Sequence, residues 1–173
     1  MSAVEATGAA THGASTAAGS PQAELAHKCL YYMLLMREVE DRIERKLYRQ
    51  GKILGGVYVG RGQEAIPVGS ALVAVPEDVL FPSHRDMAVF FIRGVSARRV
   101  LAQYMGRMGG LTRGRDGNMH MGDMSVNVVS IISALAATVP VAAGAALAMA
   151  SGAGGIELFL GGGKSGRLRP GGQ

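Results

Sequence analysis

The sequence predicts an α/β fold in which amino-terminal helices lead into the first strands of a sheet. Apolar residues recur every three or four positions from residue 22 to residue 50, which is typical of an amphipathic helix. Short apolar runs at 79–81 and 156–160 indicate buried strands. Glycine-rich segments separate these elements and predict loops, so we expect helices and strands to alternate along the chain.

The first 50 residues are expected to form a leader and one long helix. Residues 1–20 are mainly Ala, Gly, Ser and Thr, which predicts a disordered leader that ends at Pro21. Gly51 is a plausible helix stop. The helix between them is predicted to bury an apolar face made of Ala26, Cys29, Leu30, Met33, Met36, Val39, Ile43 and Leu47.

A second helix is predicted over residues 63–75, after a glycine-rich loop, with Pro67 in its first turn. The strand 79–81 follows and places Ser83, His84 and Arg85 at its carboxyl end, where open α/β sheets bind ligands. The Arg85 guanidinium suits a phosphate group, because it can donate two parallel hydrogen bonds. A surface ion pair with Asp86 or Asp78 is the alternative interpretation.

One helix is predicted between the Ser83–Asp86 motif and Gly109, over residues 96–108, with Ser96 as its N-cap. Its apolar face is Val100, Leu101, Tyr104 and Met105. The glycines at 109, 110, 114 and 117 then predict an ordered loop that ends at Met121. His120 in this loop is interpreted as a core residue, with a metal ligand or a proton donor as alternatives.

Composition and charge exclude several classes of protein. A net charge of +5 with only 5% aromatic residues favours anion binding but not nucleic-acid binding. The single cysteine, Cys29, excludes an internal disulfide, and residues 1–27 contain no Lys or Arg, so we expect a cytoplasmic protein. Residues 124–156 carry no charge, but small residues and Pro140 argue against a membrane span.

Four motifs together resemble one known family, the alpha subunit of the thiamine diphosphate-dependent first component of 2-oxo acid dehydrogenase complexes. The resemblance covers about residues 30–149. The motifs are Gly62-Gln63-Glu64-Ala65, Ser83-His84-Arg85-Asp86, the glycine run that ends in Gly117-Asn118-Met119-His120-Met121, and Thr138-Val139-Pro140-Val141-Ala142-Ala143-Gly144. Family members are about twice as long. The resemblance therefore implies a truncated thiamine diphosphate-binding fold, with residues 21–150 as its amino-terminal part and the first strands of a parallel sheet.

The resemblance also implies which residues meet the cofactor. His84, which replaces a tyrosine of the family, and Arg85 would contact the diphosphate. Ser133 and Leu135 would contact the pyrimidine ring, Leu135 as the wedge that bends the cofactor, and a helix over 138–150 would follow. Glu64 is expected to be structural, because the glutamate that activates the cofactor comes from the beta subunit.

The proton-transfer residues and the magnesium site depart from the family pattern. Residues 57–59 lack a histidine that family members often carry near the cofactor, and the catalytic residues are unknown. Magnesium should be held by an aspartate and an asparagine, but the glycines at 161–163 stand where that aspartate should be. We expect weak cofactor binding and no activity from this chain alone. The tail 151–173 is interpreted as aberrant, and a shifted reading frame and a natural end are both open.

The resemblance implies oxidative decarboxylation of a small 2-oxo acid, with acyl transfer to a lipoyl group. The thiazolium carbanion of thiamine diphosphate carries that chemistry. The implied partners are a beta subunit, in a heterotetramer, and the lipoyl-bearing second component. Two alternatives are a non-catalytic fragment that docks on sister subunits and a small membrane-associated protein.

Overall fold

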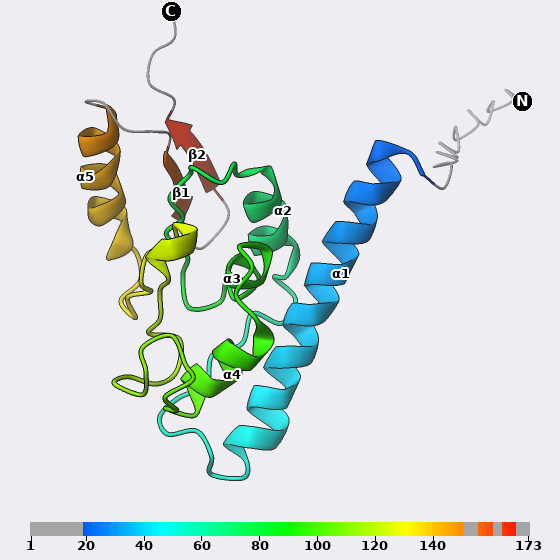
Figure 1. The fold of residues 1–173 in the computed structure, drawn as a ribbon, viewed down its shortest axis with the longest axis vertical. Coiled ribbons are helices and arrows are strands. Elements are labelled where there is room, and N and C mark those ends of the chain that lie inside the picture. Colours follow the sequence, from blue (N-terminus) through cyan, green and yellow to red (C-terminus); the bar gives the residue numbers. More distant parts are fainter. Residues whose placement is uncertain (1–18, 151–155, 161–163, 169–173) are drawn as a thin grey trace, which may run out of the picture.

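The computed structural model describes residues 19–150 together with the strands 156–160 and 164–168, and it is mainly helical (Figure 1). Residues 1–18 of the predicted leader and most of the tail lie outside the described residues. The elements in chain order are α1 (Pro21–Arg42), the π-helical segment η1 (Ile43–Tyr48), α2 (Ala65–Val73), α3 (Ala88–Ile92), α4 (Ala97–Tyr104), the 3-10 turn η2 (Met124–Val126), α5 (Thr138–Ala150), β1 (Ile156–Leu160) and β2 (Lys164–Leu168).

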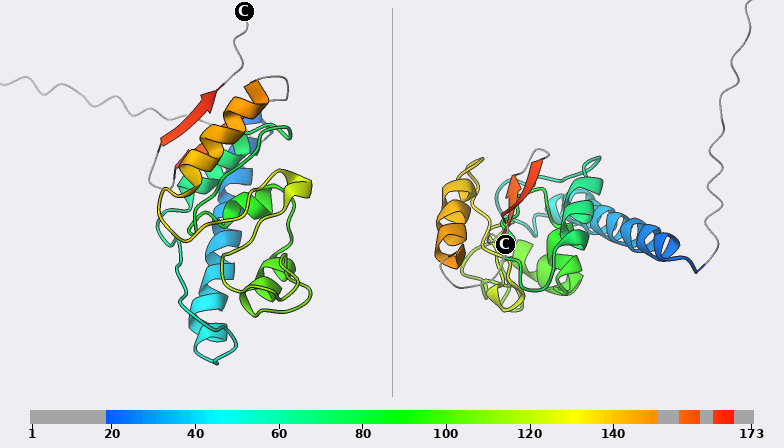
Figure 2. Two further views of the ribbon diagram at one scale, coloured as in Figure 1. Left: turned by 90° about the vertical axis from the view of Figure 1, so that its left-hand side faces the viewer. Right: turned by 90° about the horizontal axis from the view of Figure 1, so that it is seen from above.

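The long amino-terminal helix is confirmed, since α1 and η1 run together from Pro21 to Tyr48. Ser20 caps it, with its Oγ accepting a hydrogen bond of 3.1 Å from the Ala23 N–H. Its buried residues past the first turn begin at Met36, whereas the predicted core residue Leu30 is 54% exposed. Figures 1 and 2 show the reason: the first half of α1 projects away from the other helices.

Two helices, not the single predicted one, lie between the Ser83–Asp86 motif and Gly109. α3 ends at Ile92, and Gly94 adopts a φ of +90°, a left-handed conformation that glycine tolerates. Ser96 then caps α4, as predicted, by accepting a hydrogen bond from the Arg99 N–H. α2 begins at Ala65 and places Pro67 in its first turn, also as predicted.

The main core lies where the second half of α1 meets α2, α3, α4 and the segment 119–131. Its larger members are Met36, Ile43, Leu80, Phe90, Tyr104 and Met121. A smaller cluster joins Phe81 to Ala142 of α5. α5 has the bounds that the sequence predicts, although Ala142 is its only fully buried residue. None of the described helices combines the length and the apolar character that crossing a membrane requires.

Parallel pairing is limited, in the described residues, to one position of the predicted strand 79–81. The Leu80 N–H donates to the Asn127 carbonyl at 2.8 Å, and the Leu80 carbonyl accepts from the Val129 N–H at 2.9 Å. β1 forms at the predicted position but pairs with β2 in an antiparallel hairpin. The wider parallel sheet therefore stays a prediction.

A buried carboxylate joins α1 to the glycine-rich loop that precedes α2. Glu40 is 1% exposed, and its Oε1 accepts a hydrogen bond of 2.9 Å from the Gly60 N–H. Its Oε2 is buried and has no hydrogen-bond partner among the residues that the structure describes. Burial raises the pKa of Glu40 from 4.5 to about 7, partly opposed by the Gly60 hydrogen bond.

The raised pKa of Glu40 predicts that stability depends on pH. The folded state holds this proton more tightly than the unfolded state, so the free energy of unfolding should fall as the pH rises from 4.5 to about 7. The loss is at most roughly 3 kcal/mol. Urea unfolding at pH 5 and pH 8 tests this. Glu40→Gln should be more stable than wild type at pH 8 and lack this slope, and Glu38→Gln on the exposed face should keep it. Equal slopes in both variants would contradict the assignment.

Candidate functional site

A cavity of about 1200 Å³ opens beside the loop that follows α4. Its walls come from four separate parts of the chain: residues 51–58, His84, residues 104–119 with His120, and Ser133. The glycines in its lining are Gly51, Gly55, Gly56, Gly106, Gly114 and Gly117. Glycines allow the backbone to approach a ligand closely, so the predicted glycine loop does line a candidate binding site.

Gln103 holds the loop 105–121 in place, although the sequence analysis did not single it out. Its side chain is fully buried on α4. Its Oε1 accepts hydrogen bonds from the N–H and the Oγ1 of Thr112, both at 2.9 Å, and its Nε2 donates to the carbonyls of Asp116 and His120 at 3.2 and 3.4 Å. One signal in the sequence could have indicated this role: Gln103 is polar but lies on the apolar face of α4, beside Val100 and Tyr104.

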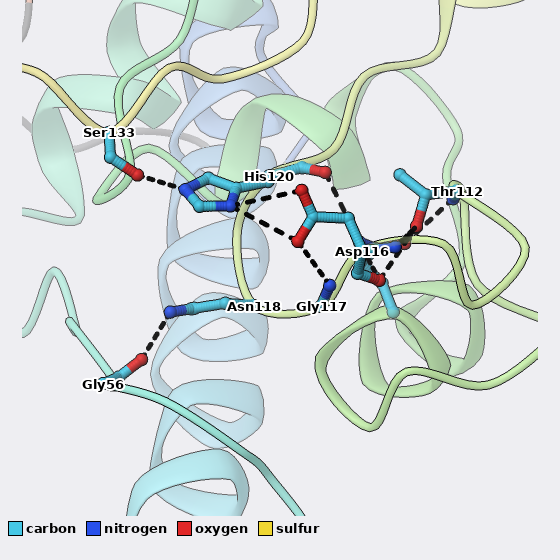
Figure 3. Close-up of polar contacts among 8 residues, drawn as sticks. Gly56, Thr112, Asp116, Gly117, Asn118, His120 and Ser133 are labelled. Carbon is cyan, nitrogen blue, oxygen red and sulfur yellow. Dashed lines mark hydrogen bonds and ion pairs between the residues drawn. The ribbon is translucent and has the colours of Figure 1, made fainter.

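Three polar side chains form a chain of contacts along the cavity wall (Figure 3). His120 Nε2 lies against Ser133 Oγ, and His120 Nδ1 lies 3.4 and 3.3 Å from the two carboxylate oxygens of Asp116. The His120 side chain is 40% exposed. The interpretation of His120 as a core residue is therefore wrong: the ring is held at the cavity by polar partners on both sides.

The loop is also tied to the segment that follows α1. Asn118 adopts a left-handed conformation, with a φ of +56°, and its Nδ2 donates to the Gly56 carbonyl (Figure 3). Asn118 Oδ1 is buried without a partner in the described structure. Two cavity walls far apart in sequence are thus joined by one side chain.

The structure brings two of the four predicted cofactor residues to the cavity. His84 and Ser133 line it, whereas Arg85 and Leu135 do not. Arg85 is exposed and has no ion-pair partner among the described residues. Asp86 is buried and accepts hydrogen bonds from the N–H and Oγ of its neighbour Ser83. Leu135 is 76% exposed. The contacts predicted for these four residues stay predictions.

His84 forms part of an aromatic wall. Its ring meets that of Tyr58 edge to face, with centroids 5.5 Å apart. Partial burial and the neighbouring Arg85 guanidinium lower the pKa of His84. The imidazole is therefore neutral at pH 7 and can donate or accept a hydrogen bond without forming an ion pair. Tyr58 lies in the segment 57–59, where the family resemblance led us to look for a histidine.

The charge of the cavity is mainly positive. Lys52, Arg107 and Arg115 line it, and none of the three forms an ion pair within the part of the chain that the structure describes. Among the described residues, Asp116 is the one carboxylate in the lining, and it faces His120. Unpaired cations beside flexible glycine backbone favour an anionic ligand.

Glu64 makes structural contacts, as the sequence analysis expects. Its Oε1 accepts from Arg37 Nε of α1 at 2.5 Å, and its Oε2 accepts from the Gly62 N–H at 3.0 Å. Burial alone would raise the pKa of Glu64, but the Arg37 hydrogen bond and backbone donors lower it below the ordinary value. The carboxylate is therefore ionised at pH 7 and connects α1 to the start of α2.

No cluster of metal-ligating side chains occurs among the described residues. The position predicted to lack the magnesium aspartate, the glycines at 161–163, lies outside the described residues. The expectation that this chain has lost its metal ligands therefore stays a prediction.

Two comparisons with known proteins, one with family models and one with individual proteins, point to the same family. The model of the family described as "Dehydrogenase E1 component" matches residues 31–162. The chain is 35% identical over 114 residues to pyruvate dehydrogenase E1 component subunit alpha-3, chloroplastic, of Arabidopsis thaliana, an alignment that covers 66% of this chain and 26% of the plant protein. It is 35% identical over 116 residues to the corresponding alpha subunit of Rickettsia bellii, which covers 67% of this chain and 35% of that protein.

A human relative shows the same partial coverage. The testis-specific, mitochondrial form of the alpha subunit is 40% identical over 93 residues, or 53% of this chain and 24% of the human protein. The matched region thus spans between about a quarter and a third of the length of these relatives. Two of them are named as chloroplastic or mitochondrial, and the cytoplasmic setting of this chain stays a prediction.

The buried amide of Gln103 yields a prediction about the loop. Gln103→Met keeps the size of the side chain but leaves the Thr112 N–H and the His120 carbonyl without their partner and removes one of the two donors to the Asp116 carbonyl, which should lower the free energy of unfolding by about 2–4 kcal/mol. The exposed Gln50→Met should change it by less than about 0.5 kcal/mol. Urea unfolding measures both, and amide exchange of Thr112 should speed up in the Gln103 variant alone. Equal stabilities would show that Gln103 does not organise the loop.

Proposed function

The chain belongs to the dehydrogenase E1 component family, and we propose that it is part of the alpha subunit of a thiamine diphosphate-dependent 2-oxo acid dehydrogenase. The reaction would be oxidative decarboxylation of a small 2-oxo acid with acyl transfer to a lipoyl group. The matched region spans about a third or less of its relatives, so this activity is proposed for the whole protein to which such a region belongs.

The observation that carries the proposal is the cationic, glycine-lined cavity. Its volume of about 1200 Å³ is ample for a cofactor of this size, and Lys52, Arg107 and Arg115 supply positive charge for a diphosphate. Ser133 and His84 lie in its lining, on segments that the family resemblance links to the cofactor. The residues present therefore fit the organic cofactor in charge and size.

Each of the four predicted residues has a proposed part in holding the cofactor. The neutral imidazole of His84 would donate a hydrogen bond to the diphosphate, and Arg85 would turn from solvent to form an ion pair with it. The Ser133 hydroxyl would bond the pyrimidine ring, and the exposed Leu135 would pack against it. When bound, thiamine diphosphate supplies the carbanion that attacks the oxo carbon of the substrate.

The fit to the cofactor is poorest for its divalent cation, magnesium. Magnesium requires several hard oxygen ligands, and the sequence has glycines at 161–163, where the family resemblance implies an aspartate. We therefore propose that this chain alone binds the cofactor weakly and is inactive. A beta subunit in a heterotetramer and a lipoyl-bearing second component are the proposed partners, in the cytoplasm.

A non-catalytic docking function is the second candidate, and exposed apolar side chains favour it. On the projecting half of α1 these are Leu25, Leu30, Tyr31 and Leu34, and on α5 they are Val141 and Leu147. Apolar side chains grouped on one helix are typical of surfaces that a partner covers. A sister subunit would bury them without any need for chemistry in the cavity.

Titration of the isolated chain with thiamine diphosphate, followed by amide NMR shifts, separates these candidates. We expect millimolar cofactor to shift the cavity glycines Gly56 and Gly117, and Arg85→Ala to weaken binding by about tenfold, which corresponds to roughly 1.4 kcal/mol for a lost charged hydrogen bond. Arg98→Ala, an exposed arginine of α4 outside the cavity lining, is the control and should bind like wild type. Absence of shifts in the cavity would leave the docking function as the better account.

A further inference from the structure

We propose that Asp116, His120 and Ser133 form a nucleophilic acyl-transfer site that hydrolyses small, negatively charged esters or thioesters. This activity is separate from the proposed function and needs no cofactor. It rests on the contacts of three side chains that two separate segments of the chain bring to one cavity wall (Figure 3).

The contacts match the three roles that such chemistry requires. A hydroxyl nucleophile must touch a base, and Ser133 Oγ lies against His120 Nε2. The base must be oriented by a third group on its other nitrogen, and the Asp116 carboxylate lies 3.3 Å from His120 Nδ1. With a proton on Nδ1, held toward the carboxylate, Nε2 is free to accept the proton of the serine.

The backbone fixes the geometry of this site. Gln103 binds the carbonyls of both Asp116 and His120, and the Gly117 N–H donates to the Asp116 carboxylate at 2.7 Å. The serine segment is tied to the histidine segment beside it, because the Ile131 N–H donates to the Met121 carbonyl at 3.0 Å. Ile131 and Met121 are both buried. His120, the base, is next to Met121, and Ser133, the nucleophile, is two residues from Ile131. Both therefore lie close to this backbone hydrogen bond.

The surroundings define the substrate class. Ser133 and His120 both line the cavity, so a substrate and a water molecule can reach them. Lys52, Arg107 and Arg115 line the same space without ion-pair partners among the described residues, which favours an acyl group that carries a carboxylate. The same positive charge would stabilise the oxyanion that forms on the substrate carbonyl.

The reaction balances without any further reagent. Ser133 Oγ bonds to the carbonyl carbon while its proton passes to His120 Nε2, and the carbonyl electrons move to the oxygen. The tetrahedral species expels the alcohol or thiol, which takes the proton from His120. Water then attacks the acylated serine, again giving its proton to His120, and the acid leaves as that proton returns to Ser133 Oγ. The net reaction is ester plus water to acid plus alcohol.

Hydrolysis of the mono-p-nitrophenyl ester of succinic acid by the purified chain tests the proposal. We expect turnover above the buffer rate and a preference for this anionic ester over p-nitrophenyl acetate. Ser133→Ala and His120→Gln should each lower the rate by about 100-fold or more. Ser130→Ala is the matched control, because Ser130 is exposed on the same segment, lies outside the cavity lining and should keep the wild-type rate.

A fluorophosphonate probe provides a second readout that does not depend on turnover. The probe should label Ser133 of the wild-type chain, identified by peptide mass spectrometry, and labelling should fall in Asp116→Asn and vanish in His120→Gln. Circular dichroism confirms that these variants fold. Unchanged ester hydrolysis in Ser133→Ala, or label on another residue, would overturn the proposal. Inhibition by thiamine diphosphate reports separately on the proposed function, because cofactor and ester would compete for one cavity.

Discussion

The hydrogen bond from the Gly60 N–H to the buried Glu40 carboxylate is the contact on which the rest of the site depends. Gly60 also lies so close to the Ser83–Asp86 motif that a Cβ added there would be 2.5 Å from the Arg85 carbonyl oxygen and 2.6 Å from Met36 Cε. Only glycine fits between α1 and that motif. Because this junction fixes both the loop and the motif, Tyr58 and His84 meet at one wall of the cavity.

The opposite wall uses a buried polar side chain in a similar way. The Gln103 side chain forms hydrogen bonds with backbone groups of the loop 105–121. A Cβ at Gly110 would come within 2.7 Å of the Gln103 backbone, so the loop packs directly on α4. Asn118 then joins this loop to Gly56. The apolar core lies behind both walls and reaches the cavity at Tyr104, Met105 and Met119. Glycine backbone, cations and the polar chain of Asp116, His120 and Ser133 make up much of the remaining lining.

Features that depend on neighbouring residues could be predicted from the sequence, and contacts between distant residues could not. The period of α1, the Ser96 cap and the bounds of α5 follow from local patterns or from motif order. The break at Gly94, the exposure of Leu30 and the placing of His120 at the cavity depend on how helices pack. Periodicity carries no information about the hydrogen-bond partners of Glu40 and Gln103. The partner of Glu40 is 20 residues away along the chain, and those of Gln103 are 9 to 17 residues away. The family itself is shown by sequence comparison, so it does not depend on the direction of the exposed Arg85 side chain.

Amide hydrogen exchange of Gly60 tests the central constraint most directly. If its N–H is held by a buried carboxylate in a packed junction, it should exchange only with global unfolding, as slowly as the core amides of Phe90 and Val100, while Gly55 in the same loop exchanges rapidly. Exchange of Gly60 at the rate of Gly55 would contradict the account, because the loop and the Ser83–Asp86 motif would then not be fixed to α1.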